Sequence, residues 1–136
     1  MLGRRDSSHY GSMTLKKIEQ SLKMMAREMS TSEKIVLKFF QSNHEGALID
    51  YIQSHARTAH GILINPGALT HYSYALRDAL ADSGLPFAEV HLSHIMKREP
   101  WRRKSVIADI ATVRVMGLKE RSYTVGLEKL LICLGA

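Results

Sequence analysis

The sequence predicts an α/β fold in which a parallel sheet is flanked by crossover helices. Short runs rich in β-branched residues alternate with longer stretches whose apolar residues recur at helical spacing, which is the pattern of parallel strands joined by helices. The chain has 136 residues, of which 45% are hydrophobic, enough for one compact core but not for a second. We therefore expect a single domain over residues 1–136.

The first predicted elements are a helix and a buried strand. Thr14 is a suitable N-cap for a helix over residues 15–29, in which apolar side chains lie three and four positions apart. Residues 35–40 form an apolar run broken only by Lys38, which predicts a strand buried on both faces. A second helix is expected from about His44.

The second half of the chain predicts three more strands and two more helices. Strands are expected over residues 61–64, 87–92 and 112–116, each β-rich, the first two bordered by Pro and Gly turn signals. A helix is expected over residues 70–81, and a last helix runs through Leu134. This order predicts a parallel sheet.

Composition and charge exclude several classes of protein. Nineteen Lys and Arg against thirteen Asp and Glu give a net charge of +6, which favours anionic partners without selecting one. No apolar run is long enough to span a bilayer, and the polar start lacks a secretory core, so a cytoplasmic location is expected. Cys133 is expected to be a buried, inert thiol. Nucleic-acid binding through the basic residues 97–104 stays a minor alternative.

Polar residues follow three of the predicted strands. They lie at residues 41–43, 65–67 and 92–94. Carboxyl ends of parallel strands meet at one edge of the sheet, where ligands bind in open α/β sheets. Each group alone could be ordinary loop chemistry, but the three together predict a ligand site.

Three residue pairs could carry chemistry there. Glu89 and His91 lie two positions apart on a strand and share a face, so the carboxylate could orient the imidazole or favour its protonated form. Arg98 and Arg102 lie four positions apart, and on one helical turn they would form a clamp for an anion. Arg5 lies five residues before Tyr10, and a guanidinium beside a phenol favours the phenolate. The alternatives are a structural role for His91 and solvated surface charges for the arginines.

The combination of motifs resembles the type II 3-dehydroquinate dehydratases over nearly the whole chain. The opening residues 2–5 with Tyr10 and Gly11 resemble the family's flexible lid, placed here at residues 1–12. The other motifs occur in the family's order and spacing: Gln41-Ser42-Asn43-His44-Glu45-Gly46, the run from Asn65 to Ala79, and Glu89-Val90-His91-Leu92-Ser93.

The resemblance implies a flavodoxin-like three-layer sandwich and a homo-oligomer, a dodecamer built from trimers. It also implies the anti elimination of water from 3-dehydroquinate to give 3-dehydroshikimate through an enolate, in the shikimate pathway or in quinate breakdown. No cofactor, metal or Schiff-base lysine is expected, and the expected partner is the anionic substrate, with neither nucleic acid nor a membrane.

The resemblance also implies a role for each matching residue. Tyr10 would be the base, Arg5 would hold it as phenolate, His91 would be the general acid and Glu89 would orient its ring. The substrate-binding residues it implies are Asn65 and His71 for hydroxyls, Leu92, Ser93 and Arg102 for the carboxylate, Arg98 for the lid, and Asp78 in a neighbouring subunit's site.

Two departures from the family pattern lead to further expectations. Family members open with a strand ending in a Gly-Pro-Asn-Leu-Asn type motif that nothing before Leu2 supplies, so the sheet is expected to lack its first strand. Lys119 and Ser122 replace glycines in the turn before the last helix, which is expected to be strained or rebuilt. The alternative function is a weak or inactive homologue that serves as a ligand-binding or structural subunit.

Overall fold

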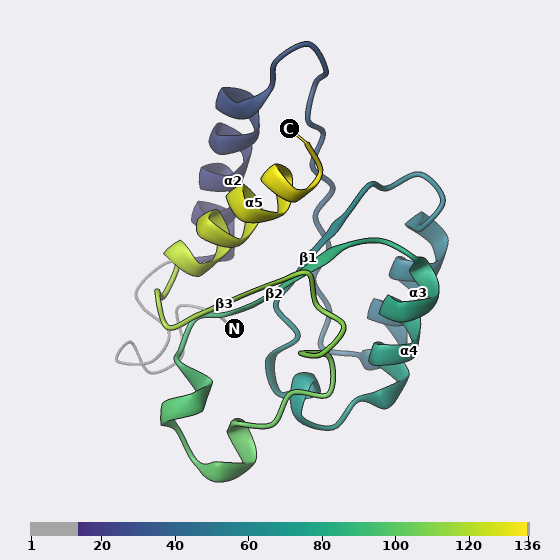
Figure 1. The fold of residues 1–136 in the computed structure, drawn as a ribbon, viewed down its shortest axis with the longest axis vertical. Helices are drawn as coiled ribbons and strands as arrows, with labels where there is room; N and C mark the ends of the chain where they lie inside the picture. Colours follow the sequence, from purple (N-terminus) through teal and green to yellow (C-terminus); the bar gives the residue numbers. More distant parts are fainter. Residues whose placement is uncertain (1–13, 136) are drawn as a thin grey trace.

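The computed structural model describes residues 14–135, which form three layers (Figure 1). The central layer is a parallel sheet of the strands β1 (Ile62–Ile64), β2 (Phe87–His91) and β3 (Val113–Met116), in the order β1-β2-β3. The helices α2 (Leu15–Met29) and α5 (Arg121–Cys133) lie on one side of it. The helices α3 (Glu45–His55) and α4 (Tyr74–Ser83) lie on the other. The predicted α/β fold with a parallel sheet is confirmed.

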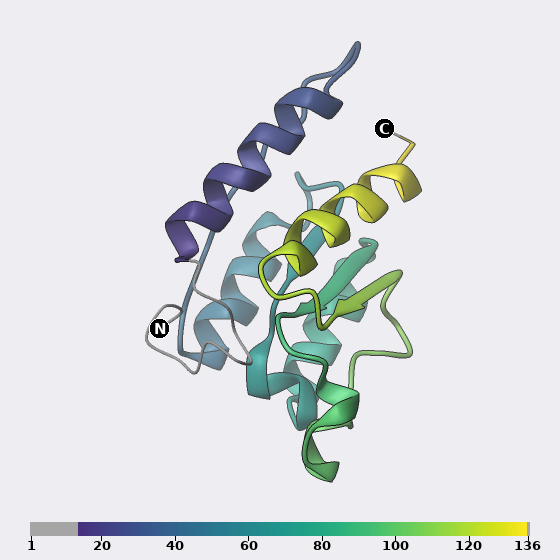
Figure 2. The same cartoon turned by 90° about the vertical axis from the view of Figure 1, so that its left-hand side faces the viewer.

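Two apolar clusters hold the layers together. On the α3 and α4 side, Leu76, Leu80, Phe87 and Ile107 are almost fully buried. On the other side, Ile18 and Leu22 of α2 pack against Leu127 and Leu131 of α5. Figure 2 shows that α2 lies outside α5, farther from the sheet. Because α2 buries its apolar stripe mainly on α5, α5 is the helix of these two that packs directly on the sheet.

The capping residues fix where two helices begin. Thr14 Oγ1 accepts a hydrogen bond from the Lys17 N–H at 3.3 Å, which confirms the predicted N-cap of α2. The predicted helix over residues 70–81 is wrong at its start. Residues Gly67–His71 form a short 3-10 helix, η1, and α4 begins only at Tyr74, because Ser73 Oγ accepts from the Leu76 N–H at 3.1 Å and caps it.

The predicted strand over residues 35–40 is also wrong. The segment is extended, but within residues 14–135 no backbone hydrogen bond joins it to the sheet. Ile35, Leu37 and Phe39 pack against the α2 and α5 cluster, whereas Val36 is 70% exposed and Phe40 46%. One face is therefore partly buried and the other largely exposed, which is not the doubly buried strand that the apolar run indicates.

Two smaller expectations are tested at α5. Cys133 is free and exposed, so the predicted buried thiol is wrong: the buried face of α5 is formed by Leu127, Leu130 and Leu131. The turn before α5 is strained, which is one of the two outcomes expected. Lys119 has a positive φ of 52°, and the fully buried Ser122 Oγ accepts a hydrogen bond from the Leu118 N–H at 3.1 Å.

None of the helices described has both the length and the apolar character needed to span a bilayer.

Candidate active site

The candidate site lies where the three strands end. The segment after β1 brings Asn65, the end of β2 brings His91 with Leu92 and Ser93, and the 3-10 helices η2 (Ile95–Lys97) and η3 (Pro100–Arg102) follow from there. Figure 1 shows η2 and η3, in green, projecting beyond this end of the sheet. Polar residues directly follow β1 and β2, as predicted, whereas residues 41–43 follow an extended segment that is not a strand.

Glu89 and His91 form a hydrogen-bonded pair. They point to the same face of β2, and His91 Nε2 lies 2.6 Å from Glu89 Oε2. Glu89 is fully buried and His91 is 5% exposed. Because the carboxylate accepts from Nε2–H, the ring orientation is fixed and Nδ1 is the nitrogen that can exchange a proton with a bound molecule. The sequence prediction of this pair is confirmed.

The Glu89 carboxylate is held by three further side chains that the sequence reasoning missed. Thr70 Oγ1 donates to Oε2 at 2.6 Å, and Arg114 Nε donates to Oε1 at 2.9 Å. Ser105 Oγ lies 2.9 Å from Oε2 and 3.1 Å from Oε1, and its single proton serves one of them at a time. Within residues 14–135, no buried side-chain polar atom lacks a hydrogen-bond partner.

These contacts keep Glu89 ionised despite its burial. Burial is the largest influence and would raise the pKa of Glu89. The hydrogen bonds from His91 and Thr70, followed by the positive charges of His91 and Arg114, outweigh it and lower the pKa from 4.5 to about 2. The group beside His91 is therefore a permanent carboxylate at neutral pH.

Asn65 is oriented by α5. Its Nδ2 donates to the Tyr123 hydroxyl at 3.0 Å, while its Oδ1 accepts from the Gly67 N–H at 3.1 Å. Burial raises the pKa of the Tyr123 phenol, so the hydroxyl stays neutral and able to accept this bond. Tyr123 thus positions Asn65, and the sequence analysis missed it as well.

His71 and the arginines form the outer rim of the site. His71 Nδ1 lies 2.6 Å from the Lys104 carbonyl oxygen, and its ring meets the edge of Trp101 with centroids 5.3 Å apart. The Arg102 guanidinium lies over the Trp101 ring at 4.0 Å and is paired with Glu99. Trp101 itself is 54% exposed.

The predicted helical clamp of Arg98 and Arg102 is wrong in its geometry. Arg98 is the C-cap that follows η2 and Arg102 is the last residue of η3, so the two residues do not share a helical turn. Pro100 at the start of η3 is the physical reason, because proline cannot continue a preceding helix. Arg98 Nη1 instead donates to Ser93 Oγ at 3.4 Å.

Asp78, a further predicted site residue, lies apart from this cluster. Asp78 is exposed on α4, on the helix face opposite the buried Leu76, Ala79 and Leu80. Arg5 and Tyr10 lie outside the described residues. The part of the chain that the structure covers holds no group of three or more His, Cys, Asp or Glu arranged for a metal ion.

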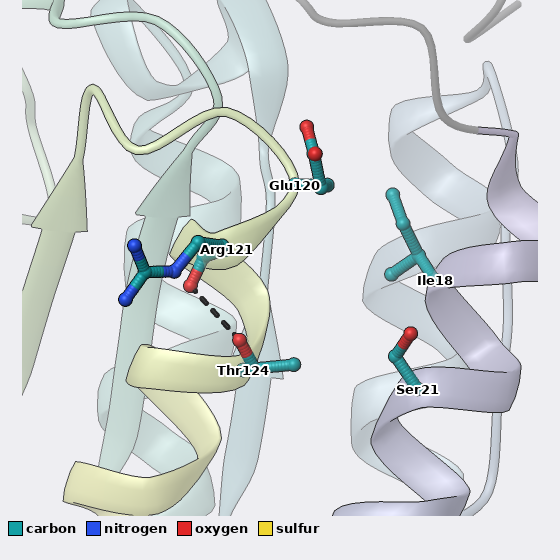
Figure 3. Close-up of a pocket in the computed structure, with 5 residues that line it drawn as sticks. All are labelled: Ile18, Ser21, Glu120, Arg121 and Thr124. Carbon is teal, nitrogen blue, oxygen red and sulfur yellow. Dashed lines mark hydrogen bonds between the residues drawn. The ribbon is translucent and has the colours of Figure 1, made fainter.

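A separate pocket between α2 and α5 does not resemble a reaction site (Figure 3). It has a volume of about 310 Å³ and is lined by Ile18, Ser21, Glu120, Arg121 and Thr124. Thr124 Oγ1 donates to the Arg121 carbonyl, and the Arg121 guanidinium points away from Ile18 and Ser21. No charged side chains converge there, unlike at the strand ends.

The fold and the strand-end site define an α/β protein with a buried, hydrogen-bonded carboxylate–histidine pair beside a basic rim. The family profile described as "Dehydroquinase class II" matches residues 1–131. The chain belongs to the class II dehydroquinase family.

Individual relatives agree with this assignment. The chain is 51% identical to a 3-dehydroquinate dehydratase of Roseiflexus castenholzii, covering 96% of this chain and 81% of the relative. It is 46% identical to catabolic 3-dehydroquinase 1 of Neosartorya fischeri, covering 94% and 83%. The crystal structure of the type II dehydroquinase from Butyrivibrio crossotus superposes with a TM-score of 0.88 at 36% identity, covering 96% of this chain and 88% of that one.

Proposed function

We propose that the strand-end site converts 3-dehydroquinate to 3-dehydroshikimate, as a hydro-lyase of the class II dehydroquinase family. The observation that carries this is the buried Glu89–His91 pair, which presents one imidazole nitrogen at the carboxyl end of β2. A general acid needs a fixed ring and a proton that it can release toward the leaving group. The pair supplies both.

The reaction is an elimination in two steps. Tyr10, as a phenolate beside Arg5, takes a proton from the carbon next to the ketone, and the electron pair of that bond forms the enolate. The enolate then expels the hydroxyl group while His91 donates the Nδ1 proton to it, so that water leaves and the carbon–carbon double bond forms. Glu89 stabilises the imidazolium and holds the ring throughout.

The basic rim binds the substrate. In the structure Arg102 is paired with Glu99, and it would exchange this partner for the substrate carboxylate. Backbone groups of Leu92 and Ser93 would bind the same carboxylate. Asn65 and His71 hold substrate hydroxyls, and both are already oriented by hydrogen bonds within the protein. Arg98 supports the lid. A positive rim suits an anion because opposite charges attract over several ångströms.

Assembly is part of the proposal. Asp78 is exposed and turned away from its own chain's core, which leaves its carboxylate accessible to the site of a neighbouring subunit. A dodecamer built from trimers is the state that we expect, and light scattering coupled to size-exclusion chromatography measures it. The cytoplasmic location stays a prediction.

Turnover of 3-dehydroquinate tests the activity. The conjugated enone product absorbs in the ultraviolet, so purified protein should raise the absorbance, and Tyr10→Phe should abolish turnover while leaving substrate binding nearly unchanged. His91→Gln should stall the second step but still allow hydrogen exchange at the acidic carbon. A folded wild-type protein that binds a carboxylated ring analogue by calorimetry but gives no product would instead support the ligand-binding subunit.

A further inference from the structure

Two basic side chains, rather than one, hold the carboxylate of Glu89. His91 binds Oε2 from the same strand, and Arg114 binds Oε1 from β3. The register explains this second contact, because Arg114 is the residue of β3 directly opposite Glu89 and their side chains share a face of the sheet. The Arg114 side chain is 29% exposed, so its charge is partly but not fully screened by solvent.

The charges of the three groups decide how readily His91 gives up its proton. With Glu89 ionised and Arg114 positive, the cluster has a net charge of +1 when His91 is protonated and zero when it is neutral. Without Arg114 the same two states would carry zero and −1. A buried cluster disfavours net charge, so Arg114 favours the neutral imidazole and the lone Glu89–His91 pair favours the imidazolium.

We propose that Arg114 is a positioning residue that tunes His91 as a proton donor, by holding the second oxygen of Glu89 and offsetting its negative charge. A histidine paired with a buried carboxylate alone is held in its protonated form and releases its proton reluctantly. Arg114 weakens that hold without removing the hydrogen bond that orients the ring. This inference rests on the proposed function of His91 as general acid.

In residues 14–135, His91 and Arg114 are the titratable side chains that hydrogen-bond to Glu89. Within the described residues, its hydrogen-bond partners are Thr70, His91, Ser105 and Arg114. Other titratable side chains on the elements around the site are those of His71, His94, Lys97, Arg98, Glu99, Arg102, Arg103, Lys104, Lys119, Glu120, Arg121 and Tyr123. These side chains are the same in a variant of Arg114 and in the wild type. A difference between the two pH profiles therefore reports on the Arg114 guanidinium.

The kinetic test compares pH profiles of kcat. The alkaline limb of such a profile reports loss of the proton from the general acid in the enzyme–substrate complex. In Arg114→Gln and in Arg114→Met we expect this limb to move to higher pH by about 0.5 to 1 unit, since a charge a few ångströms away and partly exposed has an effect of that order. Arg114→Lys should return the limb toward the wild-type position.

The matched control is Arg57→Gln, which removes one exposed positive charge in the turn after α3. It should leave the limb unmoved. If both neutral variants at position 114 keep the wild-type profile, or shift it to lower pH, the proposal is wrong. A loss of kcat that is equal at every pH and is not restored by Arg114→Lys would also overturn it, because a merely structural role gives that result.

A direct titration separates this inference from the proposed function. The sequence has seven histidines, and the His91 imidazole signal in the NMR spectrum is the one that His91→Gln lacks. Its titration midpoint should move to higher pH in Arg114→Gln, with or without substrate. An inactive wild type would refute the proposed function while this midpoint still tests Arg114, and an unmoved midpoint in an active enzyme would refute only the role of Arg114.

Discussion

Replacing Glu89 by glutamine should change how the stability of the protein depends on pH. Glu89 is fully buried, and its pKa falls from 4.5 in the unfolded chain to about 2 in the folded protein. A carboxyl group whose pKa is lowered by folding stabilises the folded state above its unfolded pKa, and this contribution is lost as the pH falls through the folded value. The contribution is therefore present above about pH 4.5 and is gone near pH 2.

The magnitude follows from the size of the shift. The two pKa values differ by about 2.5 units, and each unit corresponds to about 1.4 kcal/mol, so Glu89 contributes on the order of 3 kcal/mol to the free energy of unfolding at neutral pH. Glutamine has one acceptor oxygen where the carboxylate has two. A glutamine at position 89 would therefore leave at least one of the hydrogen-bond donors of His91, Thr70 and Arg114 without an acceptor. The Glu89→Gln variant is expected to have a lower free energy of unfolding at pH 7 than the wild type.

Urea unfolding followed by circular dichroism, at one protein concentration and at several pH values from 7 to 2.5, measures this effect. The difference in unfolding free energy between wild type and Glu89→Gln should shrink by about 3 kcal/mol as the pH falls. Glu128→Gln, at an exposed position of α5, is the control and should not show this dependence. Parallel curves for wild type and Glu89→Gln would refute the account of Glu89 as an ionised buried group.

Three further substitutions test the packing and the turns. Lys119→Gly should raise the free energy of unfolding by about 0.5 to 1 kcal/mol, because glycine accepts the positive φ of 52° that lysine resists, and thermal unfolding would show the rise. Gly126→Ala should lower it by about 1 to 2 kcal/mol despite the better helix propensity of alanine, since a Cβ there would lie 2.6 Å from Val90 Cγ1 in the core; an unchanged or higher melting temperature would contradict this. Ser73→Ala removes the cap of α4 and should cost about 1 kcal/mol in urea unfolding, whereas Ser73→Thr should recover most of it.

Local geometry explains which parts of the site could be predicted. The period of two along a strand places Glu89 and His91 on one face whatever the rest of the chain does, so the sequence alone predicts that pair. The end of each strand likewise predicts where Asn65 and Ser93 lie. Thr70 and Ser105 contact Glu89 from residues 19 and 16 positions away along the chain, and no local pattern marks them.

The wrong predictions have nonlocal causes as well. Residues 35–40 have a strand-like composition, but a strand also needs a partner, and only the face with Ile35, Leu37 and Phe39 finds packing. Arg114 meets Glu89 only through the register of β2 and β3, which the sequence does not specify. The separation of Arg98 from Arg102 could have been predicted, since Pro100 lies between them.

The burial of the His91 ring also bears on how the enzyme resets itself. Nε2 is capped by a carboxylate that stays ionised, and only 5% of the residue is exposed, so Nδ1 is the one nitrogen through which the ring can be reloaded from water. In the proposed mechanism, that same nitrogen gives its proton to the leaving hydroxyl group. On that mechanism the product would have to depart before a fresh proton arrives, and recharging the acid would be a separate event in each catalytic cycle.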